Sequence, residues 1–238
     1  MEGQRADKCG ALFFEDADLR VEQDKEWVSR GAYKLLRAFQ VFPLSVEGLR
    51  CLDIGASTGG FTEVLLAQGA SRVYAVDVGY GQLSWKLRTS PQVVVMERTN
   101  ARHLTPGDFD EPPQFCCMDA SFISLTCILP RIDEILPPLG EAVILVKPQF
   151  EAGRERLGKG GVVSDPQVHR EVLQEAGAFV KEQTSFVVCG LDYSPLRGPK
   201  GNIEFLFHLG RDAAKNALSP EKIAQVVEEA HAMEEQIP

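Results

Sequence analysis

With 238 residues, the chain is long enough for one sizeable hydrophobic core, and no change in composition along it indicates a second one. The formal net charge of −9 comes mainly from the two ends, because residues 1–26 hold eight acids and four bases and residues 219–238 hold five acids and one base. No apolar run is long enough to span a membrane, no secretion signal begins the chain, and the six cysteines and four histidines lack metal-site spacing, so we expect a soluble, cytoplasmic protein without a metal.

The first predicted elements are an N-terminal extension and a helix. Residues 1–26 are polar and acidic and form the extension, and residues 27–238 form the domain, which ends in an acidic helix. Ser29 is a typical helix N-cap, and apolar residues at helical spacing predict a helix from there to about Val41. Lys34 lies on this helix, where a solvent-exposed lysine is the default interpretation.

Residues 51–62 have the pattern of a cofactor-binding turn, because an apolar strand over 49–54 runs into glycines and then into a helix. The spacing matches neither the dinucleotide fingerprint nor the phosphate-binding P-loop, but Gly55-x-Ser57-x-Gly59 is also the pattern of a hydrolase nucleophile elbow. Only about fifty residues precede the turn, whereas several strands precede a hydrolase elbow. A second strand-end acid, Asp77, follows about twenty residues later, so a cofactor that contains a nucleoside is favoured over the elbow.

Strands and helices alternate through the next part of the chain, which predicts a parallel sheet with right-handed crossovers. Strands are predicted over residues 72–77, 92–96, 115–119 and 141–147, and helical segments over 82–88 and 123–136. Polar side chains lie at the carboxyl ends of the successive strands, and these are Asp53, Asp77, Asn100, Asp119 and Lys147. Since ligands of open α/β sheets bind at this edge, we expect the five side chains to border one site.

The last third of the chain adds a long loop, a helix and two more strands. Residues 148–165 are rich in glycine and basic residues and are either a binding loop or a solvated linker, and a helix follows from Pro166 to about Gln183. Strands over 186–191 and 203–209 are joined by a turn-rich segment, so one of them is predicted to run antiparallel to the rest. The final helix, from Pro220, carries an apolar stripe that we interpret as a packing face.

Eight blocks of sequence are specific enough to carry a family resemblance. They are Val28–Leu35 (VSRGAYKL), Leu52–Thr62 (LDIGASTGGFT), Ala75–Leu83 (AVDVGYGQL), Glu97–Asn100 (ERTN), Asp119–Leu125 (DASFISL), Val146–Glu151 (VKPQFE), Gly158–Val163 (GKGGVV) and Gly201–Phe205 (GNIEF). In this order they resemble the TlyA-type haemolysin and ribosomal RNA methyltransferase family, which is related to the FtsJ-like 2'-O-methyltransferases. The resemblance also implies that most of an N-terminal RNA-binding domain is missing, so residues 1–26 are either an extension or the remnant of that domain.

The fold implied by this resemblance is the Rossmann-like, S-adenosylmethionine-dependent methyltransferase fold. This is an α/β fold with a seven-stranded, mostly parallel sheet, one antiparallel strand and helices on both faces. The implied cofactor is S-adenosylmethionine, with its ribose hydroxyls on Asp77 and its adenine beside Asn100. The full set of implied cofactor-binding residues is Asp53, Gly55, Ala56, Ser57, Thr58, Gly59, Gly60, Phe61, Asp77, Val78, Asn100 and Asp119. The resemblance further implies a catalytic tetrad of Lys34, Asp119, Lys147 and Glu204.

The implied activity is methyl transfer to a ribose 2'-hydroxyl of ribosomal RNA, with cytidine as the expected nucleotide and ribosomal RNA or ribosomal subunits as partners. Lys147 in its neutral form would accept the hydroxyl proton, while Asp119 and Glu204 position the lysines and the hydroxyl. Basic residues that would form an RNA-binding face are Arg30, Lys34, Arg37, Arg154, Arg156, Lys159, Arg197 and Lys200.

Two other functions stay open from the sequence. A factor that binds the cofactor and ribosomal RNA without turnover would keep the same glycine turn, and it would bind the cofactor without transferring a methyl group. A membrane-active, haemolysin-like protein is less favoured, because the chain has no spanning segment and no strongly basic amphipathic helix.

Overall fold

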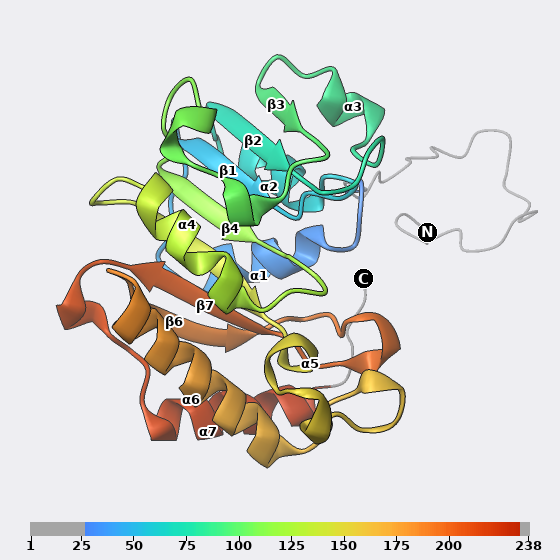
Figure 1. Cartoon of the computed structure of the whole chain (residues 1–238), viewed down its shortest axis with the longest axis vertical. Coiled ribbons are helices and arrows are strands. Elements are labelled where there is room, and N and C mark those ends of the chain that lie inside the picture. The colour runs from blue at the N-terminus through green and yellow to red at the C-terminus, as the bar shows by residue number, and fades with distance from the viewer. Residues whose placement is uncertain (1–26, 234–238) are drawn as a thin grey trace, which may run out of the picture.

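The computed structural model describes residues 27–233, which form a seven-stranded sheet with helices on both faces (Figure 1). The predicted extension over residues 1–26 lies outside the described residues, as do the last five residues of the chain.

Helices or 3₁₀ turns separate successive strands along the chain. The strands are β1 (Arg50–Ile54), β2 (Arg72–Val76), β3 (Val93–Met96), β4 (Phe115–Met118), β5 (Glu141–Val146), β6 (Val187–Tyr193) and β7 (Phe205–Gly210). The helices are α1 (Ala32–Val41), α2 (Gly60–Ala67), α3 (Trp85–Arg88), α4 (Leu129–Ile135), α5 (Pro148–Glu151), α6 (Pro166–Gln183) and α7 (Pro220–Ala232). Single 3₁₀ turns, η1 to η7, cover Ala101–His103, Pro106–Asp108, Leu125–Cys127, Arg154–Arg156, Lys159–Gly161, Pro199–Gly201 and Ala213–Lys215.

The strand order is β3-β2-β1-β4-β5-β7-β6, and β7 runs antiparallel to both β5 and β6. The predicted hairpin, with one antiparallel strand, is therefore confirmed. The order of the strands reverses between β1 and β4, which is where open α/β sheets bind ligands. The register pairs Asp53 with Ala75 on one side and with Cys117 on the other, so β1, β2 and β4 end level with one another.

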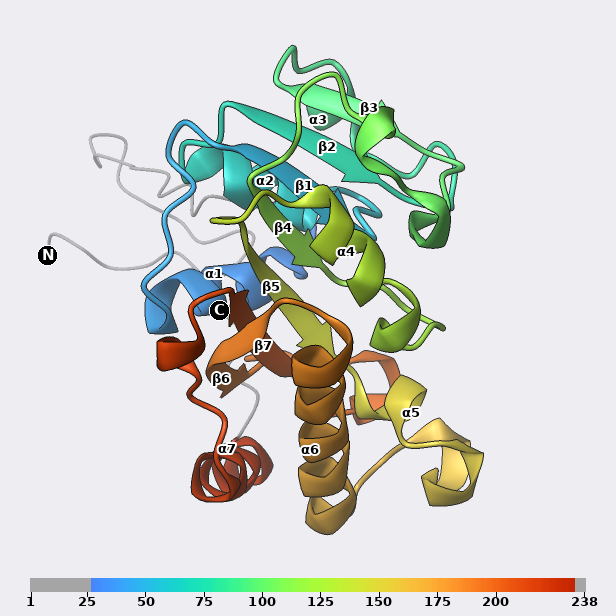
Figure 2. The same ribbon diagram turned by 60° about the vertical axis from the view of Figure 1, so that its left-hand side comes forward.

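Two layers of helices bury the two faces of the sheet (Figure 2). In β4, Phe115 and Cys117 pack into the layer of α1 and α2, whereas Cys116 and Met118 pack into the layer of α4 and α6. The α7 helix packs against α6 and β6 through the predicted apolar stripe, in which Val226 and Val227 are fully buried. The carboxyl edge of the sheet is left uncovered by these layers and is lined by loops (Figure 1).

Three local predictions differ from the structure. The α1 helix begins at Ala32 with Gly31 at the cap position, so Ser29 is not its N-cap. The helix predicted over 123–136 is split into η3 and the shorter α4, because Pro130 in the first turn of α4 cannot donate a backbone hydrogen bond. The connection over 148–165 contains the short helix α5 and two 3₁₀ turns rather than irregular loop alone.

Two histidine rings join α6 to α7. Nδ1 of His169 lies 2.9 Å from Nε2 of His231, and the buried His169 ring also packs edge-on against Phe205. Burial, followed by the nearby His231 ring, lowers the pKa of His169 to about 4. Other charged groups near the pair are Asp165, Arg170 and Arg197.

We expect the free energy of unfolding to fall as the pH falls from about 6.5 towards 4. A histidine in the unfolded chain takes up a proton near pH 6.5 (roughly its ordinary pKa), whereas folded His169 resists protonation until the pH reaches about 4. Acidification therefore favours the unfolded state, by on the order of 1–3 kcal/mol. Thermal unfolding measured across this window should show a weaker pH dependence in His169→Gln than in wild type. The exposed control His103→Gln should keep the wild-type dependence, and equal slopes in all three proteins would contradict the assignment.

Candidate functional site

The turn between β1 and α2 depends on two glycines with left-handed backbone conformations. Gly55 has a φ of 84°, and a Cβ atom at this position would lie 2.7 Å from the backbone oxygen of Asp119. Gly59 has a φ of 101°, and a Cβ atom there would collide with the side chain of Leu87. Both positions therefore require glycine for conformation and for space, and the main chain of the turn stays open to a ligand.

Two aspartates support this turn. The carboxylate of Asp77 accepts hydrogen bonds from the Ser57 N–H at 2.8 Å and the Gly79 N–H at 2.7 Å. Asp53 is fully buried and accepts a 2.6 Å hydrogen bond from the Thr62 hydroxyl. Burial raises the pKa of Asp53 to about 7, while the bond from Thr62 opposes that rise. Asp53 therefore braces the turn from inside the protein, and its carboxylate does not face the ligand side.

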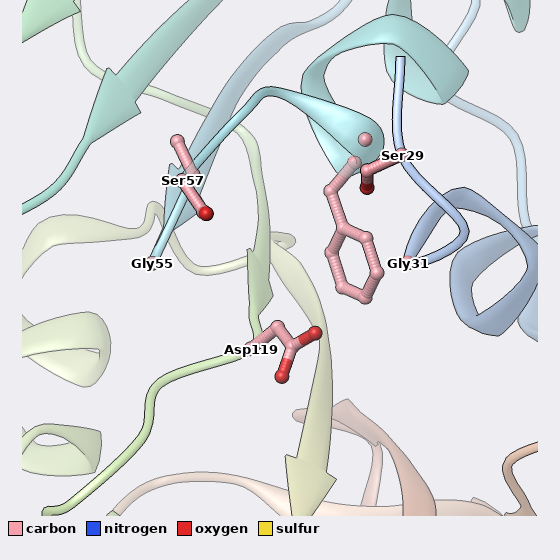
Figure 3. Close-up of a pocket in the computed structure, with 8 residues that line it drawn as sticks. Ser29, Gly31, Gly55, Ser57 and Asp119 are labelled. Carbon is pink, nitrogen blue, oxygen red and sulfur yellow. The ribbon is translucent and has the colours of Figure 1, made fainter. Parts of the chain in front are cut away.

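A cleft of about 120 Å³ opens beside the turn (Figure 3). It is lined by Ser29, Gly31, Gly55, Ala56, Ser57, Gly60, Phe61 and Asp119. Figure 3 shows Ser57 and Ser29 on opposite sides of the cleft, with Asp119 below them. Ligand pockets usually measure roughly 300–1,000 Å³, so this cleft has room for only part of a nucleoside-sized ligand, and the rest would lie along the open edge of the sheet.

The remaining predicted cofactor-binding residues do not line this cleft. Val78 is 70% exposed beyond β2, and Asn100 is exposed beyond β3, where its side chain accepts a hydrogen bond from the Arg102 N–H. Gly59 faces α3 rather than the cleft, as its contact with Leu87 shows. Ser29 and Gly31 were not predicted to lie here, because their place in the cleft depends on how the chain enters α1.

Four charged side chains from distant parts of the chain meet next to the cleft. Lys34 comes from α1, Asp119 follows β4, Lys147 follows β5, and Glu204 precedes β7. Nζ of Lys34 lies 2.7 Å from Oε2 of Glu204 and 3.2 Å from Oδ2 of Asp119. Nζ of Lys147 lies 2.5 Å from Oδ1 of the same Asp119. The structure thus brings together all four members of the predicted tetrad.

The tetrad places two lysines in contact with two acidic side chains. Its side chains are 1–18% exposed, and buried charges of this kind are stabilised by pairing. Burial opposes the charge of Lys34, but the carboxylates of Asp119 and Glu204 outweigh it and raise the pKa of Lys34. Burial likewise opposes the charge of Asp119, and Lys34 and Lys147 outweigh it and lower the pKa of Asp119. Lys34 and Asp119 are therefore held in their charged forms.

Two further residues of the loop after β4 were not predicted, and the first of them contacts the tetrad. The hydroxyl of Ser121 accepts a 2.9 Å hydrogen bond from Nζ of Lys147. Phe122 has a left-handed φ of 63° and is 92% exposed, with its ring centroid 5.3 Å from that of Phe150. A positive φ at a residue other than glycine has no local sequence pattern, so only the position of both residues just after a strand-end aspartate pointed towards the site.

Six of the eight predicted RNA-binding residues fall into two groups, whereas Lys34 belongs to the tetrad and Arg197 is half-buried. Arg37 pairs with Asp192 at 2.7 Å, and Arg156 pairs with Glu171 and Glu175 on α6. These arginines are engaged within the protein. The side chains of Arg30, Arg154, Lys159 and Lys200 are exposed to solvent, and Lys200 also donates to the backbone oxygen of Gly160.

Residues 27–233 contain neither a metal-binding cluster nor a membrane-spanning helix. No group of three or more histidine, cysteine, aspartate and glutamate side chains in this range is arranged to hold a metal ion. No helix within the same range combines the length and the apolar character needed to cross a bilayer.

Comparison with known proteins identifies the family. A family model described as FtsJ-like methyltransferase matches residues 27–211, which include all of the sheet and the tetrad. The chain belongs to the FtsJ-like methyltransferase family. The family resemblance inferred from the sequence is therefore confirmed.

Close relatives within the FtsJ-like family cover nearly the whole chain. The chain is 46% identical over 233 residues to the 16S/23S rRNA (cytidine-2'-O)-methyltransferase TlyA of Mycobacterium tuberculosis. The matched region covers 97% of this chain and 86% of that protein. A solved structure from Streptococcus thermophilus that carries the name hemolysin is 48% identical, with a TM-score of 0.83, and covers 91% of this chain and 77% of that one. A SAM-dependent methyltransferase from Aquifex aeolicus shares the fold alone, at 17% identity and a TM-score of 0.51, over 75% of this chain and 89% of that one.

The cofactor of this FtsJ-like chain is S-adenosylmethionine, as predicted. Three features of the structure fit this cofactor. Gly55 and Gly60 leave no side chain between the main chain of the turn and a ligand, and the first turn of α2 offers free N–H groups. The carboxylate of Asp77, at the end of β2, has acceptor capacity left for ribose hydroxyls.

Proposed function

We propose that this methyltransferase modifies a ribose 2'-hydroxyl of ribosomal RNA, with cytidine as the nucleotide, and that the tetrad is its catalytic site. The observation that carries the proposal is the meeting of Lys34, Asp119, Lys147 and Glu204 at the open edge of the sheet, with Asp119 shared between the tetrad and the cofactor cleft. A ribose hydroxyl is a weak nucleophile, so it must be aligned with the methyl donor and must lose its proton. Support for the substrate comes from the rRNA (cytidine-2'-O)-methyltransferase named among the relatives.

In the proposed reaction, Lys147 in its neutral form receives the proton of the 2'-hydroxyl as the hydroxyl oxygen attacks. S-adenosylmethionine, when bound, supplies a methyl group on a sulfonium centre. Lys34 keeps its positive charge between Asp119 and Glu204. Asp119 contacts both lysines and thereby holds them at a fixed separation.

The cofactor-binding residues are assigned by their position along the carboxyl edge of the sheet. The turn residues that line the cleft, together with Asp119, would hold the part of the cofactor nearest the tetrad. Asp77 would accept hydrogen bonds from the ribose hydroxyls, and Val78 and Asn100 would border the adenine beyond β2 and β3. Asp53 would act through the shape of the turn, because its carboxylate is buried.

Phe122 has the features of a surface on which an RNA base stacks. An almost fully exposed aromatic ring and a left-handed backbone are both unfavourable in a folded protein, and strained backbone of this kind is concentrated at functional sites. The ring is packed against Phe150, one turn of α5 after Lys147. Proteins that recognise single-stranded RNA stack its bases on exposed aromatic side chains. We assign Phe122 to the base of the target nucleotide or of its neighbour.

Substitution Phe122→Ala is expected to lower kcat/KM for the RNA by about tenfold or more, because base stacking on an aromatic contributes about 1–3 kcal/mol. The affinity for S-adenosylmethionine should not change, since Phe122 does not line the cleft. Methyl-transfer kinetics with varied RNA, together with calorimetry of cofactor binding, measure the two effects. Leu139→Ala is the matched control, because Leu139 is 94% exposed in a different loop. Equal losses in both variants would contradict the assignment.

The proposed function is tested by incubating the purified protein with methyl-labelled S-adenosylmethionine and with either free ribosomal RNA or isolated ribosomal subunits. We expect label to enter the RNA in at least one of these substrates, and RNA binding to weaken steeply with salt because phosphate contacts release counterions. Cofactor binding without transfer to any RNA would contradict the proposal and would support a factor without turnover.

A further inference from the structure

Three side chains join the loop after β4 to the short helix α5. Nζ of Lys147, at the start of α5, donates to Oγ of Ser121. Phe150 packs against Phe122. The carboxylate of Glu151 accepts hydrogen bonds from two groups one turn further along the loop, the hydroxyl of Ser124 at 2.7 Å and the N–H of Leu125 at 2.8 Å. The segment that carries Ser121 is therefore fixed relative to the helix that carries Lys147.

The two polar contacts of the Lys147 amine differ in kind. Nζ forms an ion pair with Oδ1 of Asp119 at 2.5 Å. Nζ also donates a hydrogen bond to the uncharged hydroxyl of Ser121, at 2.9 Å. Coulombic attraction to Asp119 holds the amine near the carboxylate at any orientation, whereas a hydrogen bond is directional. The ion pair with Asp119 therefore fixes the place of the amine, and the hydrogen bond to Ser121 adds a second fixed direction.

We propose that Ser121 is a positioning residue that aims the Lys147 amine at the substrate hydroxyl. With one N–H directed to Ser121 and the nitrogen held beside Asp119, the remaining tetrahedral positions of Nζ point away from both partners. A base must present its lone pair within hydrogen-bond reach of the proton that it accepts, and a small misalignment is costly. This inference rests on the proposed function of the tetrad and adds a fifth residue to it.

The loop offers a matched pair of serines for the test. Ser121 is exposed, so Ser121→Ala should fold, and Ser121→Thr should keep the hydroxyl with room for one added methyl group. Ser124→Ala removes a hydroxyl from the same loop without touching Lys147, because Ser124 donates to Glu151. Comparison of the three variants separates the loss of the Lys147 partner from a general loosening of the loop.

The first experiment records the side-chain ¹⁵Nζ signals of lysine by NMR in the whole protein, with the Lys147 signal assigned by its loss in Lys147→Met. We expect the signal to shift in Ser121→Ala, and to stay near its wild-type position in Ser121→Thr and Ser124→Ala. An unchanged Lys147 signal in Ser121→Ala would overturn the inference, whether or not the protein acts on RNA.

The second experiment measures steady-state methyl transfer to ribosomal RNA or subunits. Ser121→Ala should lower kcat by about tenfold with little change in KM for either substrate, and Ser121→Thr should restore most of it. A wild-type rate in Ser121→Ala, or a rise in KM without a fall in kcat, overturns the inference alone. Absence of transfer by the wild-type protein overturns the proposed function, and the NMR result still decides whether Ser121 orients Lys147.

Discussion

Replacing Lys147 with methionine is expected to lower the rate of methyl transfer by about 10²- to 10⁴-fold, the usual contribution of a positioned general base. Methionine fills a similar volume but cannot accept the proton of the 2'-hydroxyl. Binding of S-adenosylmethionine should persist, because Lys147 is not among the residues that line the cleft. Single-turnover methyl transfer to ribosomal RNA, with calorimetry of cofactor binding, measures both quantities.

The matched control for this prediction is Lys181→Met, which removes an exposed lysine from α6. It should transfer methyl groups at the wild-type rate. Thermal unfolding of both variants shows whether the buried substitution has altered the fold. If a folded Lys147→Met protein retained more than about a tenth of the wild-type rate, Lys147 would not be the base, since that role contributes at least ~10²-fold.

The substitution Gly55→Ala is expected to remove measurable binding of S-adenosylmethionine and to lower the free energy of unfolding by about 1–3 kcal/mol. An alanine at a φ of 84° is strained, and its Cβ would press on the backbone of Asp119 at 2.7 Å. The collision moves the turn and Asp119 together, so both the cleft and the tetrad are displaced. Calorimetry of cofactor binding and thermal unfolding test the two effects.

Gly48→Ala is the control for the strain that a left-handed backbone imposes on alanine. Gly48 has a φ of 71° and open space around its Cβ position, so this variant shares the conformational strain without the collision. It should lose some stability and bind the cofactor normally. Normal cofactor affinity in Gly55→Ala would show that the turn does not hold the ligand.

The helices and strands of this fold could be predicted where one local feature of the sequence, such as a helix cap, determines where an element begins or ends. The bounds of α6 agree with the prediction because Asp165 caps the helix and Pro166 starts it. The strand-end acids lie along one edge because parallel strands in register end together. Ser29 was assigned as a cap on its residue type alone, and the structure uses it as a wall of the cleft instead.

Two members of the tetrad could not be predicted from local pattern. Lys34 is placed by the packing of α1 on the sheet, and Glu204 by the antiparallel insertion of β7 between β5 and β6. Neither residue has a local feature that marks it, and only the family resemblance suggested them. The pairing of Arg156 with Glu171 and Glu175 on α6 is also tertiary, which is why this arginine was predicted to face RNA.

The position of the transferred methyl group tests the account most directly. Ribosomal RNA or subunits treated with the wild-type protein and labelled S-adenosylmethionine are digested to nucleosides and separated by mass spectrometry. We predict that the label lies on the ribose of a 2'-O-methylated nucleoside and that this product is lost with Lys147→Met. In the undigested RNA, the phosphodiester on the 3' side of the labelled nucleotide should resist alkali. Label on a nucleobase would contradict the assignment of the tetrad to a ribose hydroxyl.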